Sequence, residues 1–265
     1  MRTEIYQIFY DHASRAQVEP GFIALSNERD GGDWYEFRAI KDFLEARDLQ
    51  KDILYAFLSP KFKEKTGHCF ESINLETEAD SGASDVFLFS HGWDQLCFFK
   101  NPWEQAEAWH KGVAVESQRF FNSKGINIDV GGLVTCRRNS VFSNFILATS
   151  NYWEKWLSLA RQFSDYCNGT GSFLEQIGTR HRGALVPLKV MIQERFPTVI
   201  LSQNEFQTVV VDNLTDSIAP FFADTPENRL RLLDCDAHKQ KFCFDGQKTD
   251  DFEQYIQDRE AVLLT

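Results

Sequence analysis

Apolar residues along this chain form short uninterrupted runs, separated by segments in which they recur at helical spacing. Continuous runs bounded by Gly, Pro or charged residues are typical of strands that are buried on both faces of a sheet. They predict strands at 5–11, 21–25, 52–58, 85–89, 141–148 and 206–212. The run DILYAFL at 52–58 stops abruptly before Ser59, Pro60 and Lys61, so we expect it to deliver these residues to a surface.

Between these runs, apolar positions recur every three or four residues, which predicts amphipathic helices at about 34–47, 101–122, 151–163 and 187–201. The second of these helices begins with Asn101 as its N-cap and Pro102 in its first turn. Strands that alternate with helices predict an α/β fold, with a mostly parallel sheet and helices on both faces.

The last part of the chain has a different character. From about residue 213 the sequence is more polar, with short helical patterns at 226–234 and 250–260. We therefore expect one main domain over residues 1–212, and a peripheral helical extension over 213–265 that packs on the same domain.

Charge and composition narrow the functional classes. The chain has 28 basic and 39 acidic residues, a net charge of −11, and no long basic cluster, so nucleic-acid binding is not expected. Six cysteines without a CxxC pair argue against a zinc cage. No stretch resembles a signal peptide or a transmembrane segment, which predicts a cytoplasmic protein.

Polar residues follow several of the predicted strands, where ligands bind in open α/β sheets. They include Tyr10 and Asp11 after the first strand, Ser59 and Lys61 after the third, and the stretch SHGWDQ at 90–95 after the fourth. Each has a plain structural alternative. Lys61 either pairs with a diphosphate or is solvated at a helix start, and Asp94 either meets a ligand or caps the next segment.

Two charged pairs leave similar alternatives open. Arg137 and Arg138 suit phosphate, but paired arginines near a surface are more often solvated. Glu194 and Arg195 lie in an apolar helical pattern, either as a structural ion pair or as a catalytic carboxylate held by its neighbour. The chain contains no GxGxxG, GxxxxGK[ST] or GxSxG motif, and its one DxD sequence, at 234–236, lies in the polar tail.

Four stretches occur in a suggestive order: DWYEFRAIKDFL followed by DILYAFLSPKF, then DVFLF, then SVFSNFILATSNYWEKWL, and last VPLKVMIQERFPTVIL. In this order they resemble a group of bacterial GT-A-type glycosyltransferases associated with capsule and O-antigen polysaccharide synthesis. The resemblance covers roughly residues 4–212, and it consists of residue classes more than of fixed letters.

The resemblance implies a Rossmann-like nucleotide-binding half joined without a linker to an acceptor-binding half. Carried over by position, the donor-binding residues would be Tyr10, Asp11, Ser59, Lys61 and Arg138, the acceptor-side residues Asn144, Trp93 and Glu194, and the catalytic carboxylates Asp94 and Glu194. Such enzymes commonly hold Mn²⁺ or Mg²⁺ through a DxD motif at the end of a central strand. Here that strand reads DVFLFSHGWD. Either His91 and Asp94 hold the ion, or basic side chains replace it, or the domain is inactive.

The resemblance thus implies a glycosyltransferase that moves a sugar from a nucleotide-sugar donor to a glycan or to a lipid-linked acceptor, the latter giving peripheral contact with a membrane. A second hypothesis is a non-catalytic GT-A-like module that binds a glycan or a partner enzyme of polysaccharide synthesis. A third is a metal-dependent hydrolase built on His91, Asp94 and His110, which requires these residues to converge in space.

Overall fold

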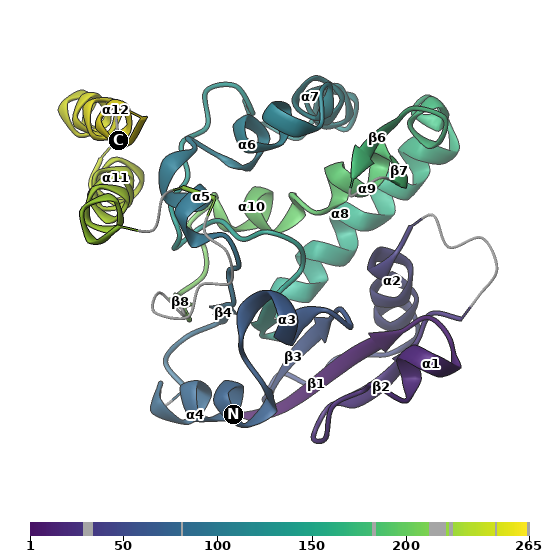
Figure 1. Ribbon diagram of the computed structural model, residues 1–265. Coiled ribbons are helices and arrows are strands. Elements are labelled where there is room, and N and C mark those ends of the chain that lie inside the picture. Colours follow the sequence, from purple (N-terminus) through teal and green to yellow (C-terminus); the bar gives the residue numbers. More distant parts are fainter. Residues whose placement is uncertain are drawn as a thin grey trace.

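The computed structural model describes residues 1–28, 34–80, 82–181, 184–211, 221–222, 225–246 and 248–263. Among these residues, six strands form a central sheet in the order β2-β1-β3-β5-β4-β8 (Figure 1). Strand β5 is antiparallel to both of its neighbours, whereas β1 pairs in parallel with β2 and β3, and β4 pairs in parallel with β8. The predicted α/β fold with a mostly parallel sheet is confirmed.

The strands lie in the predicted apolar runs. They are β1 (Arg2–Phe9), β2 (Ile23–Ser26), β3 (Ile53–Leu58), β4 (Val86–Leu88), β5 (Ile146–Ala148) and β8 (Thr208–Val210). All six residues of β3 are buried, as expected for the central run. The strand predicted at 141–148 forms only in its last three residues, because Ser143 has a φ of 62° and an extended strand cannot continue through that conformation.

Helices cover both faces of the sheet. Alternate β3 residues, Tyr55 among them, belong to the larger core, which α2 (Glu36–Ala46) and α8 (Ser150–Asn168) cover. The other β3 residues, Leu58 among them, face a smaller core under α3 (Phe62–Thr66) and α4 (Phe70–Ala79). The period of two along a strand produces this division. A short helix, α1 (His12–Arg15), follows β1.

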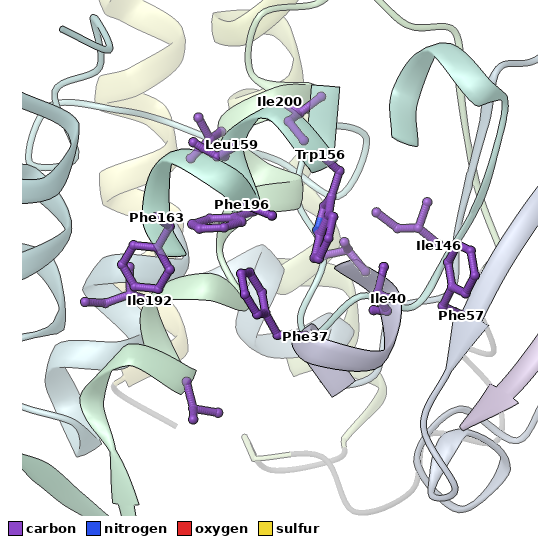
Figure 2. Packing of buried hydrophobic residues seen from close by; sticks show 14 of the residues in the cluster. Phe37, Ile40, Phe57, Ile146, Trp156, Leu159, Phe163, Ile192, Phe196 and Ile200 are labelled. Carbon is purple, nitrogen blue, oxygen red and sulfur yellow. The ribbon is translucent and has the colours of Figure 1, made fainter. Parts of the chain in front are cut away.

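Aromatic and aliphatic side chains interdigitate in the larger core (Figure 2). Phe37 of α2 packs against Trp156 of α8 with ring centroids 5.4 Å apart, and Phe163 packs against Phe196 at 5.3 Å. Each such pair contributes about 0.5–1.5 kcal/mol beyond the area that it buries. These contacts join three helices that are far apart in the sequence.

The helix predicted at 101–122 is two helices, α6 (Pro102–Trp109) and α7 (Val113–Ser123), and α5 (Trp93–Phe98) precedes them. The break coincides with Gly112, whose φ of 95° is incompatible with a continuous helix. Asn101 is the N-cap as predicted, since its side-chain oxygen accepts hydrogen bonds from the backbone N–H groups of Trp103 and Glu104, both at 2.9 Å.

The helix predicted at 187–201 is also two, α9 (Leu188–Gln193) and α10 (Phe196–Leu201). Pro197 has no N–H to bond to the carbonyl of Gln193, so the ladder is interrupted there. The segment between α8 and α9 contains the 3₁₀ helix η1 (Ser172–Glu175) and a hairpin of β6 (Gly178–His181) and β7 (Ala184–Pro187).

The polar tail forms two helices that are longer than predicted, α11 (Pro226–Phe244) and α12 (Thr249–Leu263). They pack on α5 through Leu232 and Val262, which contact Trp93 and Phe98 in a third apolar cluster. The predicted boundary at 212–213 lies outside the described residues.

Candidate functional site

A pocket of about 480 Å³ opens beyond the carboxyl ends of β1, β3 and β4. Its walls come from the loops after these strands, from the start of α2, and from α6 and α9. The chain continues from β1 to its neighbour β2 on one side, and from β3 toward the other side of the sheet. Open α/β sheets bind ligands in the crevice where the connections diverge in this way.

The structure brings six of the predicted site residues together in this pocket. They are Tyr10, Asp11, Ser59, Lys61, His91 and Glu194. They come from four separate segments of the chain, so their convergence is a property of the fold.

The loop after β1 is held by a capping box. The Asp11 carboxylate accepts a hydrogen bond from the Ser14 backbone N–H at 2.7 Å, and the Ser14 hydroxyl oxygen accepts bonds from the N–H groups of Tyr10 and Asp11. The bond from the Ser14 backbone lowers the pKa of Asp11. Asp11 therefore fixes the loop that presents Tyr10 to the pocket.

The segment after β3 supplies positive charge. The buried Ser59 hydroxyl accepts a hydrogen bond from the Lys61 N–H at 3.2 Å where α3 begins. Lys61 and Lys65 are four residues apart, so they lie on the same side of this helical turn, and both line the pocket. Two ammonium groups at one wall favour an anionic ligand in a chain whose net charge is −11.

A carboxyl group lies against this positive wall. Glu36, at the start of α2, lines the pocket beside Tyr10 and Lys65. Burial raises the pKa of Glu36, and the negative charge of Glu194 raises it further, while the positive charge of Lys65 acts in the opposite direction. Burial and the Glu36 carboxylate also raise the pKa of Tyr10. A carboxyl with a raised pKa in a cleft is typical of functional sites.

Backbone strain is concentrated at the same place. Of the three non-glycine residues with positive φ in the described part of the chain, Tyr35 (48°) and Ser143 (62°) line the pocket. Such conformations cost on the order of 1–3 kcal/mol each and cluster where a ligand or a reaction requires a fixed geometry.

The wall formed by α9 and α10 contains an ion pair. Arg195 is 4% exposed, and its Nη1 donates to the Met191 carbonyl at 2.7 Å and to the Glu194 carboxylate at 3.0 Å. Its Nε is buried without a hydrogen-bond partner among the described residues. Glu194 is partly exposed to the pocket, so Arg195 holds it in place while one side of the carboxylate stays accessible.

Four predicted site residues lie outside this pocket. Asp94 and Trp93 are buried in α5, and the Asp94 carboxylate accepts hydrogen bonds from the backbone N–H groups of Phe221 and Phe222. Arg138 is exposed and lies over the Phe244 ring. Asn144 lines a small adjoining cavity of about 40 Å³, where it accepts a hydrogen bond from Trp156.

These positions disagree with two of the hypotheses made from the sequence. The His91 and Asp94 pair does not fit a divalent cation, because the Asp94 carboxylate is directed to the 221–222 amides rather than to the pocket. Across the residues that the structure describes, no group of three or more His, Cys, Asp or Glu side chains is placed to hold a metal. The same placement of Asp94 separates it from His110, so the triad required by the hydrolase hypothesis does not form.

The DxD sequence at 234–236 is likewise structural. Asp236 is fully buried in α11, and its carboxylate accepts bonds from the backbone N–H and the Nε of Arg137. The same contact explains Arg137, which anchors the loop before β5 to the C-terminal helices.

Sequence reasoning missed Glu36, Tyr35 and Lys65. Glu36 and Tyr35 belong to the segment predicted as a helix start, and Lys65 follows Lys61 at a spacing of one helical turn. Lys65 could have been found from the stretch SPKFKEK, in which it follows Lys61 at a helical spacing of four residues. No local pattern indicates that the start of α2 faces the end of β1, since tertiary packing alone brings them together.

A second cleft, of about 530 Å³, lies at the carboxyl end of α2 and carries charged groups that pair with one another. Glu45 bonds to Lys41 and Arg161 there. This cleft lies at the amino end of β3, whereas open α/β sheets bind ligands beyond the carboxyl ends of their strands.

Within the described ranges, none of the helices combines the length and the apolar character needed to cross a bilayer. Comparisons with models of protein families, with curated proteins and with solved structures gave no significant match to this chain. The functional assignment therefore rests on the chemistry of the pocket.

Proposed function

We propose that this protein is a glycosyltransferase of surface polysaccharide synthesis, which binds a nucleotide-sugar in the pocket after β1 and β3 and transfers the sugar to a glycan or lipid-linked acceptor. The observation that supports this most directly is the gathering of Tyr10, Lys61 and Glu194 from distant segments into one pocket. Its volume of about 480 Å³ is within the usual range for small-molecule sites.

The lining suits each part of such a donor. Tyr10 and Tyr35 offer aromatic surface for the base, and Lys61 and Lys65 offer charge for the diphosphate. The partly exposed Glu194 carboxylate can accept hydrogen bonds from sugar hydroxyl groups. The carboxylates of the pocket repel a diphosphate, so the phosphates would bind beside Lys61 and Lys65 and away from Glu194.

In the proposed reaction, an acceptor hydroxyl oxygen attacks the anomeric carbon, the bond from that carbon to the diphosphate oxygen breaks, and its electron pair leaves with the diphosphate. Lys61 and Lys65 stabilise the developing negative charge. Glu194, held by Arg195, takes the acceptor proton. No step is assigned to Mn²⁺ or Mg²⁺, because the described side chains do not provide a ligand set for them.

The test begins with thermal-shift measurements of UDP-, GDP-, CMP- and dTDP-sugars, each with and without Mn²⁺. A ligand at 100 times its dissociation constant stabilises the native state by about 2.7 kcal/mol. We expect a shift for one nucleotide class that is lost in Lys61→Ala and Lys65→Ala. Lys63→Ala is the matched control, because Lys63 lies on the same helix but is exposed and pairs with Glu19.

Turnover is then measured as release of the nucleoside diphosphate in the presence of glycan acceptors. We expect Glu194→Gln to retain nucleotide binding and to lose at least 100-fold in turnover, the usual contribution of a general base. Binding without turnover in the wild type would favour the non-catalytic module. The absence of any shift at millimolar donor would overturn the proposed function.

A further inference from the structure

Two large aromatic side chains stand exposed next to the pocket. Trp109, the last residue of α6, is 41% exposed, and Phe221 is 53% exposed. Their rings meet at a right angle with centroids 5.0 Å apart, so they form an open corner. A contiguous exposed apolar surface of this kind can mark a binding site.

The fold holds this corner rigidly. The buried Asp94 carboxylate accepts hydrogen bonds from both the Phe221 and the Phe222 N–H groups, at 2.6 and 3.1 Å. The Phe222 ring then packs on Phe98, with centroids 4.3 Å apart. Burying a carboxylate is costly unless hydrogen bonds compensate for the loss of water, as these two backbone N–H groups do. Here they fix the backbone that presents Phe221.

Trp109 is fixed from the other side. Its ring packs edge to face against the mostly buried Phe99, with centroids 5.8 Å apart. The next residue, His110, is oriented by a 2.9 Å hydrogen bond between its Nδ1 and the Thr179 hydroxyl. Both rings of the corner are therefore preorganised, which reduces the entropic cost of binding a ligand.

The corner adjoins the pocket through α6. Gln105, one helical turn before Trp109, and His110, directly after it, both line the pocket. Lys61 and Lys65 reach the pocket from α3 at the end of the sheet, whereas α6 belongs to a separate layer of helices (Figure 1). A ligand on the corner would therefore enter the pocket from the side of α6, and not from the side of α3 and its lysines.

The corner presents apolar ring faces beside side chains that form hydrogen bonds. It therefore suits a ligand that has both an apolar face and hydrogen-bonding groups. A hexopyranose has C–H groups on one face, which pack on aromatic rings, and hydroxyl groups at its edge, which can reach Gln105 and His110. We propose that Trp109 and Phe221, positioned by Asp94, form a binding platform for a hexopyranose unit of the carbohydrate acceptor. The role of this carbohydrate as an acceptor rests on the proposed function, whereas the binding of carbohydrate to the platform does not.

The experiment uses the full chain and measures intrinsic tryptophan fluorescence and calorimetric binding. The probes are oligosaccharides of four to six glucose, mannose, galactose or N-acetylglucosamine units. We expect at least one series to bind, and Trp109→Ala and Phe221→Ala each to weaken that binding at least tenfold. Trp109→Phe should retain most of it, because a ring remains. Leu230→Ala, at an exposed position on α11, is the matched control and should leave binding unchanged.

Two outcomes would overturn the platform. One is that none of the oligosaccharides binds the wild type, or that binding is unaffected by both alanine substitutions. The other is that liposomes, and not carbohydrates, bind in a manner that depends on Trp109 and Phe221. The nucleotide thermal shift, measured on the same variants, separates this result from the proposed function. A shift that persists in Trp109→Ala would leave the donor site standing whether or not the platform fails.

Discussion

At the scale of single residues, Glu36 is expected to make the stability of the protein depend on pH. Burial raises its pKa in the folded state, so between its usual pKa and the raised value the folded protein binds more protons than the unfolded chain. The free energy of unfolding therefore falls as pH rises through that window. Glu36→Gln removes this penalty and should stabilise the protein at pH 7.5 by on the order of 1 kcal/mol, as replacement of site residues often does.

In a chain of this size, 1 kcal/mol corresponds to about 2–4 °C in melting temperature. Melting temperatures of both proteins, measured from pH 4 to pH 8, should diverge as pH rises and converge near pH 4, where the native carboxyl is protonated. Glu64→Gln, at an exposed position on α3, should follow the wild type throughout. A lower melting temperature for Glu36→Gln at pH 7.5 would mean that the hydrogen bonds to the carboxylate outweigh its burial.

At the scale of elements, the start of α6 depends on Asn101. Its side-chain oxygen caps the helix, and its Nδ2 donates to the backbone carbonyls of Val130 and Leu133, so one buried amide joins α6 to a distant loop. A lost N-cap costs about 1 kcal/mol, and each lost hydrogen bond about as much again. We expect Asn101→Ala to lower the free energy of unfolding in urea by roughly 2–4 kcal/mol.

Asn101→Ser separates the two roles, because the hydroxyl oxygen can still cap the helix while both amide donors are lost. Its loss of stability should lie between those of the alanine variant and the wild type. Equal losses in Asn101→Ala and Asn101→Ser would assign the whole effect to the carbonyl contacts and would contradict a capping role.

The same elements show what a sequence can predict. The cap at Asn101 and the strand at 52–58 depend on neighbouring residues, and both are confirmed. The long helices predicted at 101–122 and 187–201 were wrong in their continuity. Gly112 and Pro197 interrupt them, although the apolar spacing continues across both breaks. Spacing reports which face of a segment is buried, and not whether its hydrogen-bond ladder is continuous.

Part of the site was predictable, because it depends on residues that directly follow the ends of strands. Tyr10, Lys61 and His91 follow strand ends, and the rule for parallel sheets brings them together. Asp94 is only three residues beyond His91, yet it begins a helix that turns its carboxylate toward the 221–222 segment. That contact spans more than a hundred residues of sequence, and no local pattern encodes it.

At the scale of the whole molecule, α11 and α12, which together form a C-terminal helical hairpin, are expected to be an integral part of the fold. The fully buried Lys239 of α11 donates from Nζ to the carbonyls of Leu96 and Phe99, and the Tyr255 hydroxyl of α12 donates to the carbonyl of Phe98. Together they satisfy carbonyl groups at the end of α5, which the helix itself leaves without partners. The hairpin and α5 therefore share one set of hydrogen bonds.

Lys239→Met keeps the length of the side chain but leaves two buried carbonyl groups unpaired, at a cost of roughly 2–4 kcal/mol. Because α5 adjoins the sheet and the pocket, we expect the wild type and the variant each to unfold in a single transition, with that of the variant shifted to lower temperature. Circular dichroism at 222 nm and tryptophan fluorescence should give coincident curves, which is the test for two-state unfolding. Lys241→Met, at an exposed position one half-turn away, is the control and should not shift the curve. An early transition seen only by circular dichroism would show that the hairpin unfolds independently, and would restore the view of the tail as a peripheral extension.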